Sequence, residues 1–371
     1  MADVSGARIA FFLPSLSGGG AERVLVTLAN SLACRGHSVD FVLCSRSGPY
    51  LKDLDERVNI IDLHTRRVIT AVIPLLLYLR RARPHALMSS LMHSNVVASL
   101  AITLDGRKTR LLLREANTLG AGGRNISIKH YVLMKMVGWA YRRADALVAV
   151  SQGVLDQMVR VLRLPARVEK QVILNPVVEE TLRSRYHLPV SPAWPWEDGL
   201  PVLLGVGRLV PAKDFSTLLE AFTLVNRVRP SRLIILGEGP ERDALQVQAQ
   251  RLGVSDSVWL PGFVENPFAH MRNASVFVLS SRLEGLPNVL IQAMACETPV
   301  VATRCPSGPE EILENGRLGA LVEVGDVQAM AAAILDSLEG RAGAKGLSDN
   351  RYDVDVVTDQ YQALILGGGN R

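Results

Sequence analysis

Cysteine is scarce in this sequence: its 371 residues include Cys34, Cys44, Cys296 and Cys305 and no other. None of the four forms a Cys-x-x-Cys pair, and none lies near histidines at the spacing of a zinc site. A small secreted domain built on disulfides is therefore not expected, and neither is a zinc module. We expect reduced, mostly buried thiols in a cytoplasmic protein.

Long hydrophobic runs are also missing. The longest apolar run, residues 68–79, is interrupted by Pro74 and is shorter than the roughly 20 residues that cross a bilayer. The first residues, MADVSGARIAFFLP, lack a basic segment followed by a long apolar one, so we expect no signal peptide.

The sequence has only a small excess of positive over negative residues, with a formal net charge of +5. No basic stripe interleaved with aromatic residues stands out, so nucleic acid is not an expected partner. A mild positive charge suits phosphorylated small molecules or an anionic membrane surface. Hydrophobic residues make up 48% of the chain, enough to bury the cores of two domains.

Short apolar runs alternate with helical patterns along the chain, which predicts a parallel sheet covered by helices on both faces. Residues 187–201 break the alternation with four prolines and predict a linker. We therefore expect two doubly wound, Rossmann-like α/β domains at 1–186 and 202–352. A terminal helix at 353–371 is expected to pack back on the first domain.

Ligands of such sheets bind beyond the carboxyl ends of the strands, and with two domains the cleft between them is the expected site. Gly18, Gly19 and Gly20 follow the first strand and precede a helix, where backbone can approach a phosphate or sugar. Their GGGxxR spacing is not that of a dinucleotide fingerprint. A tight structural turn is the alternative.

Two cations, Arg208 and Lys213, follow the first strand of the second domain. Together they can clamp a diphosphate, although loop cations are more often simply solvated. In SSRLEGLPNVLIQAMACETPVVAT, Glu284 and Gln292 flank the start of an apolar helix, a position that favours ligand contact.

The first domain offers polar side chains near two predicted strand ends: His93, Arg114, Glu115 and Asn117. They are candidates for the acceptor or sugar side, with structural roles as the alternative. The two Asp-x-Asp pairs, at 53–55 and 353–355, lie away from the strand ends, and no metal site is expected.

Residues 66–84 and 129–143 each place basic residues at the ends of an apolar stretch. This pattern suits the interface of an anionic membrane. A core-packed helix with solvated ends is the alternative.

Eight motifs, in order, resemble the retaining glycosyltransferases of family 4: GGGAERVL, VAVSQGV, ILNPV, VGRLVPAKDFSTLLEAF, LIILGEGPERDAL, LPGFVENP, VFVLSSRLEGLPNVLIQAMACETPVVAT and GPEEIL. The resemblance covers nearly the whole chain. It implies a GT-B fold, a nucleotide-sugar donor held mainly by the second domain, an acceptor held mainly by the first, and no metal.

The resemblance also implies roles for individual residues. Arg208 and Lys213 match the diphosphate-binding pair, and Glu284 matches the first acid of the E-x7-E motif, which contacts the donor sugar. The remaining donor-binding positions that it implies are Gly19, Gly20, Gly207, Gly285, Leu286, Asn288 and Val289.

The sequence departs from the family pattern at two points. Gln292 replaces the second acid of E-x7-E, and in the family this residue bonds the ribose hydroxyls. The stretch REAN stands where many members carry a histidine, for which His93 is a weak substitute.

We therefore expect a retaining hexosyltransferase that moves a sugar from a nucleotide-diphosphate sugar, a UDP-sugar, to a lipid-linked or growing bacterial saccharide. It would work in the cytoplasm, at the inner membrane face, without a cofactor. A nucleotide-sugar epimerase and a catalytically silent sugar-nucleotide-binding protein are the alternatives.

Overall fold

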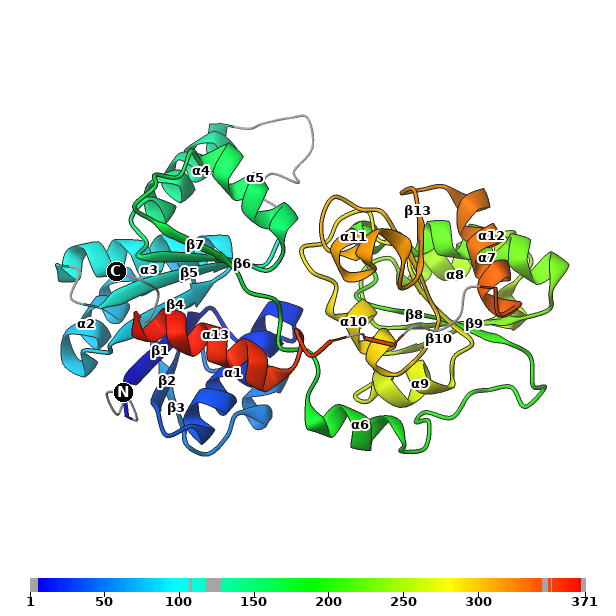
Figure 1. Ribbon diagram of the computed structural model, residues 1–371, viewed down its shortest axis with the longest axis horizontal. Helices are drawn as coiled ribbons and strands as arrows, with labels where there is room; N and C mark the ends of the chain where they lie inside the picture. The colour runs from blue at the N-terminus through cyan, green and yellow to red at the C-terminus, as the bar shows by residue number, and fades with distance from the viewer. Residues whose placement is uncertain (1–5, 107–108, 118–127, 342–345, 348, 368–371) are drawn as a thin grey trace. The chain divides into compact units, whose positions relative to one another are not determined.

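The computed structural model describes residues 6–106, 109–117, 128–341, 346–347 and 349–367 (Figure 1). The chain forms two compact units. Unit 1 comprises residues 1–176 and 351–371, and unit 2 comprises residues 177–350.

Unit 1 is built on a parallel sheet of seven strands in the order β3-β2-β1-β4-β5-β6-β7 (Figure 1). The strands are β1 (Arg8–Leu13), β2 (Ser38–Leu43), β3 (Val58–Asp62), β4 (Ala86–Ser90), β5 (Arg110–Glu115), β6 (Ala146–Ala149) and β7 (Glu169–Val172). All residues of β4 are buried, as expected for a parallel strand with helices on both faces.

The helices of unit 1 include the long C-terminal one. They are α1 (Gly20–Cys34), η1 (Pro49–Asp53), η2 (Val68–Ala71), α2 (Val72–Ala82), α3 (Met92–Asp105), α4 (Ile128–Tyr141), α5 (Gln152–Leu162) and α13 (Val354–Leu366). α13 lies beside α1 (Figure 1). Its Val357, Tyr361, Leu364 and Ile365 belong to the same hydrophobic cluster as strands β1 and β2. The last helix is thus an integral part of the first unit's core.

Unit 2 repeats this architecture with six parallel strands in the order β10-β9-β8-β11-β12-β13 (Figure 1). They are β8 (Val202–Val206), β9 (Arg232–Leu236), β10 (Val258–Gly262), β11 (Val276–Leu279), β12 (Val300–Thr303) and β13 (Ala320–Val322). The helical segments are α6 (Glu180–Tyr186), η3 (Pro211–Lys213), α7 (Phe215–Val228), α8 (Arg242–Arg251), η4 (Ser255–Ser257), α9 (Pro267–Asn273), α10 (Asn288–Ala295), α11 (Pro309–Ile312), η5 (Glu314–Gly316) and α12 (Val327–Leu338).

Each sheet has one point where the strand order reverses. In unit 1 the chain runs from β1 to β2 and β3 on one side and then crosses to β4; in unit 2 it runs from β8 to β9 and β10 and then crosses to β11. The loops that follow β1 and β4, or β8 and β11, therefore diverge at the carboxyl edge. This is where open α/β sheets bind ligands.

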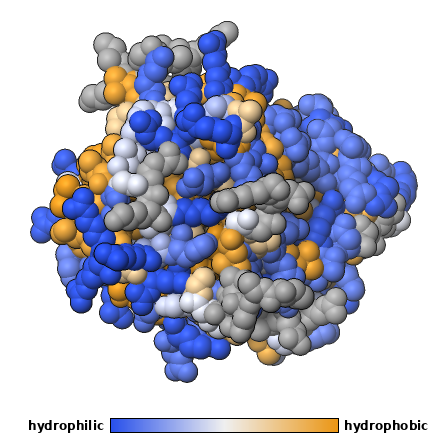
Figure 2. Space-filling view, turned by 60° about the vertical axis from the view of Figure 1, so that its left-hand side comes forward, coloured by the Kyte–Doolittle hydropathy of each residue, from blue (hydrophilic) through white to orange (hydrophobic). Residues whose placement is uncertain are grey.

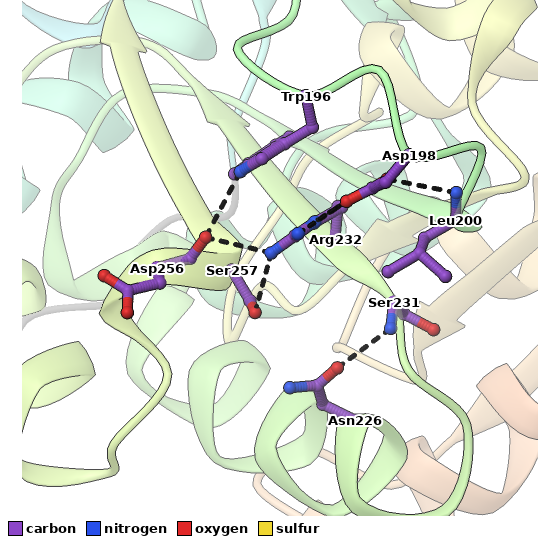
Figure 3. Close-up of polar contacts among 8 residues, drawn as sticks. All are labelled: Trp196, Asp198, Leu200, Asn226, Ser231, Arg232, Asp256 and Ser257. Atoms are coloured by element: carbon purple, nitrogen blue, oxygen red, sulfur yellow. Dashed lines mark hydrogen bonds and ion pairs between the residues drawn. The ribbon is translucent and has the colours of Figure 1, made fainter.

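The predicted linker at 187–201 is instead a packed part of unit 2 (Figure 3). The Arg232 guanidinium, at the start of β9, donates to Asp198 Oδ2 at 2.9 and 2.5 Å and lies 4.9 Å from the Trp196 ring centroid. Trp194 Nε1 donates to His270 Nδ1 at 3.0 Å. These contacts fix the proline-rich segment at the amino end of the sheet.

The boundaries predicted at 186 and 352 shift accordingly, because the units divide after Pro176 and after Asn350. Prolines mark where regular structure ends, but they do not show whether the irregular segment is packed.

Candidate active site

The strand-order reversal of unit 2 brings two side chains of opposite charge together. Lys213 ends η3, which follows β8, and Glu284 lies in the loop after β11. Lys213 Nζ is 2.5 Å from Glu284 Oε1, and Ser281 Oγ donates to the same oxygen at 2.6 Å. Both side chains are largely buried, with 21% and 10% exposure. The pair thus forms a charged, hydrogen-bonded centre at the carboxyl edge of the sheet.

Backbone contacts hold the two loops in register. Ser280 Oγ donates to the carbonyl of Lys213 at 2.8 Å, and the amide of Arg282 donates to the carbonyl of Ala212 at 2.9 Å. Asp214 has a φ of 49°, and its buried carboxylate accepts from Thr217 Oγ1 and Arg282 Nε, each at 2.8 Å. Lys213 is therefore positioned by the β11 loop as well as by its own.

Gly207, after β8, lies against the loop that follows β9. A Cβ on Gly237, whose φ is +137°, would lie 1.9 Å from the Gly207 carbonyl oxygen. Only glycine permits this approach. A Cβ on Gly207 itself would lie 3.5 Å from Lys213 Cε. Gly207 is therefore packed between the backbone at Gly237 and the aliphatic part of the Lys213 side chain.

The loop that leads into α10 is closely packed too. Ser307 Oγ donates to the carbonyl of Gly285 at 2.9 Å, and Leu286 is buried. A Cβ on Gly308 would lie 2.6 Å from Pro287 Cδ. Asn288 and Val289 form the first turn of α10, whose amino end carries the positive end of the helix dipole.

Two further predicted donor residues have unengaged side chains in the part of the chain that the structure describes. Arg208 is exposed and makes no ion pair there. Gln292 is half-buried on α10, and its side chain makes no hydrogen bond to another described residue. Both are available for a ligand.

Cys305 lies near this centre but is a poor nucleophile. Burial, reinforced by the nearby Glu284 carboxylate, raises the pKa of its thiol to about 12. Since the thiolate is the reactive form, Cys305 is expected to act as a packed apolar residue.

The glycine-rich turn of unit 1 follows β1, at the strand-order reversal of that sheet. Gly18 has a φ of +100°, Gly19 precedes α1 and Gly20 begins it. A Cβ on Gly19 would lie 2.2 Å from Glu22 Oε2. His93 is exposed in the first turn of α3, beyond β4, on the other side of the reversal.

Arg114 differs from its predicted place beside the ligand, because it is completely buried. Its guanidinium donates to Tyr361 Oη at 3.2 Å, Ser90 Oγ at 3.2 Å and Asn175 Oδ1 at 2.6 Å. Arg114 lies within β5, not after it, and ties α13 to the sheet. This arrangement favours a structural role.

Glu115, the last residue of β5, is also buried. Tyr141 Oη donates to its Oε2 at 2.5 Å, and the tyrosine oxygen accepts from Asn95 Nδ2 at 2.8 Å. Burial raises the pKa of the Glu115 carboxyl, although the Tyr141 hydrogen bond opposes the shift. Asn117 is exposed two residues on, so of these three residues it is the one open to an acceptor.

Among the residues that the structure describes, no group of three or more histidine, cysteine or acidic side chains could hold a metal ion. The aspartates of the two Asp-x-Asp pairs have other partners: Asp53 pairs with Arg23, Asp55 with Arg57 and Asp355 with Arg35.

Two residues that position the charged pair, and one exposed aromatic residue at the same edge of the sheet, were not singled out in the sequence. Ser281 and Asp214 position the charged pair, and Phe263, directly after β10, is 71% exposed at the same edge of the sheet. An apolar aromatic following a strand end, in LPGFVENP, is the signal that could have identified Phe263.

Comparison with known proteins agrees with this geometry. Residues 18–180 match the model described as Glycosyltransferase Family 4, and residues 200–340 match that of Glycosyl transferases group 1. The lipopolysaccharide core biosynthesis glycosyltransferase LpsE of Rhizobium meliloti is 30% identical over 94% of this chain and 96% of its own. The chain belongs to glycosyltransferase family 4.

Other relatives of this family 4 protein agree on family and fold. An N-acetylgalactosaminyltransferase of Campylobacter jejuni, named for an undecaprenol diphosphate acceptor, is 26% identical over 90% of each chain. The structure of Anabaena HepE in complex with UDP-glucose superposes with a TM-score of 0.78 at 20% identity, covering 97% of this chain and 99% of HepE. The predicted GT-B fold is confirmed.

Proposed function

We propose that this glycosyltransferase transfers a hexose, with retention of anomeric configuration, from a UDP-sugar to a lipid-linked or growing bacterial saccharide. The observation that carries the proposal is the Lys213–Glu284 pair at the strand-order reversal of unit 2. At this point the Lys213 ammonium can bind the diphosphate of a donor, while the Glu284 carboxylate accepts hydrogen bonds from the hydroxyls of the donor sugar.

In the proposed reaction, the bond between the anomeric carbon and the diphosphate oxygen breaks, and the leaving diphosphate gains negative charge. Lys213, Arg208 and the amino end of α10 would stabilise that charge. The acceptor oxygen bonds to the anomeric carbon from the same face, and its proton passes to the leaving phosphate. No protein base is needed for this step.

We propose that the cations of the site replace a metal ion, so that transfer continues in excess EDTA. Complete loss on chelation, with recovery on adding Mg²⁺ or Mn²⁺, would contradict this part of the proposal.

Two names support the choice of substrates. HepE binds UDP-glucose, and the Campylobacter relative is named for a diphospho-undecaprenol acceptor. We therefore propose a UDP-sugar as donor and a polyprenol-linked or lipopolysaccharide-type saccharide as acceptor, met at the inner face of the membrane. No helix in the described part of the chain is long and apolar enough to cross a bilayer, so the proposed association is peripheral.

A donor panel tests the proposal. The protein is incubated with UDP-, GDP- and ADP-sugars and bacterial lipid-linked saccharides, and the product's anomeric proton is observed by NMR. Release of UDP with a product of the donor's configuration is expected. Sugar conversion without acceptor would indicate an epimerase, and tight donor binding without turnover would indicate a silent binding protein.

A further inference from the structure

A row of aliphatic side chains covers the outer face of η2 and α2. Ile69, Ile73 and Leu77 follow one another at four-residue spacing and are 54%, 57% and 61% exposed. This spacing places them on one face of the helical segment. The opposite face already fills the core, through Leu75, Leu76 and Leu79. α2 is therefore apolar on both faces, whereas a surface helix normally turns a polar face to water.

The neighbouring helix extends this row. α2 and α3 pack together, Arg80 Nη2 donates to the carbonyl of Leu104 at 3.3 Å, and the Leu104 side chain is 53% exposed. We call Ile69, Ile73, Leu77 and Leu104 the outer apolar row. Figure 2 brings the α2 side of unit 1 forward and shows apolar side chains at the surface among hydrophilic ones.

Arginines flank the row at both ends. Arg66 and Arg67 precede it, and Arg80, Arg81 and Arg83 follow it, all exposed. Arg80 lies 3.7 Å from Asp105, whose side chain is 6% exposed. The other four make no ion pair with any residue that the structure describes. We call these five residues the arginine rim.

We propose that the outer apolar row and the arginine rim dock unit 1 on an anionic lipid bilayer. The aliphatic side chains would enter the boundary between headgroups and acyl chains, and the rim would bind lipid phosphates. A second copy of the chain fits this surface less well, since an isologous contact would bring two arginine rims together. The inference deepens the proposed function by naming the surface that meets the acceptor's membrane.

The test is sedimentation of the full-length protein with vesicles of phosphatidylcholine alone or mixed with phosphatidylglycerol. Wild type should bind the anionic vesicles, less strongly as salt rises. Ile73→Ser with Leu77→Ser should weaken binding by roughly tenfold or more through lost apolar burial. Arg67→Gln with Arg81→Gln should weaken it by a similar factor, about tenfold, through lost phosphate attraction.

Matched controls lie on unit 2. Val228 is 71% exposed, so Val228→Ser removes an exposed aliphatic side chain elsewhere. Arg227→Gln with Arg251→Gln makes the same charge change on exposed helix positions. Both controls should bind vesicles like wild type. The altered side chains of the row are more than half exposed, so the melting temperature should not change.

Equal binding to both vesicle types, no binding, or wild-type binding by the row variants would overturn the docking surface. A concentration-dependent dimer that the Ile73/Leu77 variant abolishes would assign the row to a second copy instead. UDP binding, measured by calorimetry, separates this inference from the donor proposal. A protein that binds anionic vesicles but not UDP keeps the surface and loses the proposed donor.

Discussion

Lys213 and Glu284 lie 71 positions apart in the chain, yet their charged atoms are 2.5 Å apart. Each follows one of the two strands at which the order of the second sheet reverses. The topology of the sheet thus assembles the pair, and the hydrogen bonds of Ser280 and Ser281 fix it.

Removing either cation should impair the chemical step more than nucleotide binding. We expect Lys213→Ala and Arg208→Ala each to lower kcat by roughly 10²-fold, as loss of a preorganised charge at a developing anion does. Arg251→Ala, on an exposed helix position of the same unit, should leave kcat unchanged. Steady-state kinetics with UDP affinity measured in parallel checks this, and near-wild-type kcat in both variants would refute the clamp.

Glu115 should make stability depend on pH. Burial raises the pKa of its carboxyl in the folded protein. At pH values between the unfolded and the folded pKa, the folded protein therefore holds a proton that the unfolded chain has released. Its contribution is therefore most favourable below the unfolded pKa, near 4.3, and declines as pH rises through the folded pKa.

The variant Glu115→Gln keeps a neutral side chain at this position and lacks that titration. The melting temperature of the variant should therefore rise relative to that of wild type as the pH increases from about 4 to about 8. Most of this change should occur between the unfolded and the folded pKa of Glu115. Differential scanning calorimetry at several pH values measures the difference. A constant offset between the two proteins would show that Glu115 does not titrate with a raised pKa.

Much of the architecture was predictable from the sequence. Apolar runs that alternate with helical patterns are local features, and they indicate parallel α/β units without any knowledge of long-range contacts. Strand ends were less certain. Arg114 was predicted near a strand end and on the ligand side, but it is a buried residue of β5 whose guanidinium contacts Tyr361 of α13. Successive side chains of a strand point to opposite faces of the sheet, so a place near the strand end does not by itself bring a side chain to the ligand.

The packing of residues 187–201 could not be predicted for a different reason. The contacts of Trp196 and Asp198 with Arg232 depend on partners more than 30 positions away. The prolines of the segment predict an irregular backbone, but composition does not predict contacts between residues far apart in the chain. For the same reason the short distance between Lys213 and Glu284 could not be predicted.

We expect Phe263 to stack on the nucleobase of the donor. It follows β10 at the carboxyl edge, and Gly262 before it accepts a 2.8 Å hydrogen bond from the amide of Gly237 in the adjacent loop. Stacking of a base on an aromatic ring contributes about 1–3 kcal/mol. Phe263→Ala should therefore weaken UDP binding by about that free energy, measured by calorimetry, and Phe263→Tyr should retain it. Equal affinity in the alanine variant would remove Phe263 from the site.

Gln292 tests how the ribose is recognised in a chain that lacks the second acid of the family motif. Its side chain has no hydrogen-bond partner within the described residues, and it is half-buried on α10. A carboxylate can only accept hydrogen bonds, whereas the amide has one acceptor oxygen and an NH₂ donor. It can therefore bond both ribose hydroxyls, accepting from one and donating to the other, although without charge assistance.

We accordingly expect Gln292→Ala to weaken UDP binding by about 1–2 kcal/mol, while Gln292→Glu binds UDP at least as tightly as wild type near neutral pH. Gln250→Ala, an exposed glutamine on α8, is the matched control. Calorimetry with 2′-deoxy-UDP provides a second check. The difference in affinity between wild type and the alanine variant should be smaller for 2′-deoxy-UDP than for UDP, because one of the two ribose bonds is already lost. Unchanged UDP affinity in Gln292→Ala would mean that the glutamine is a helix-surface residue and that other groups bind the ribose.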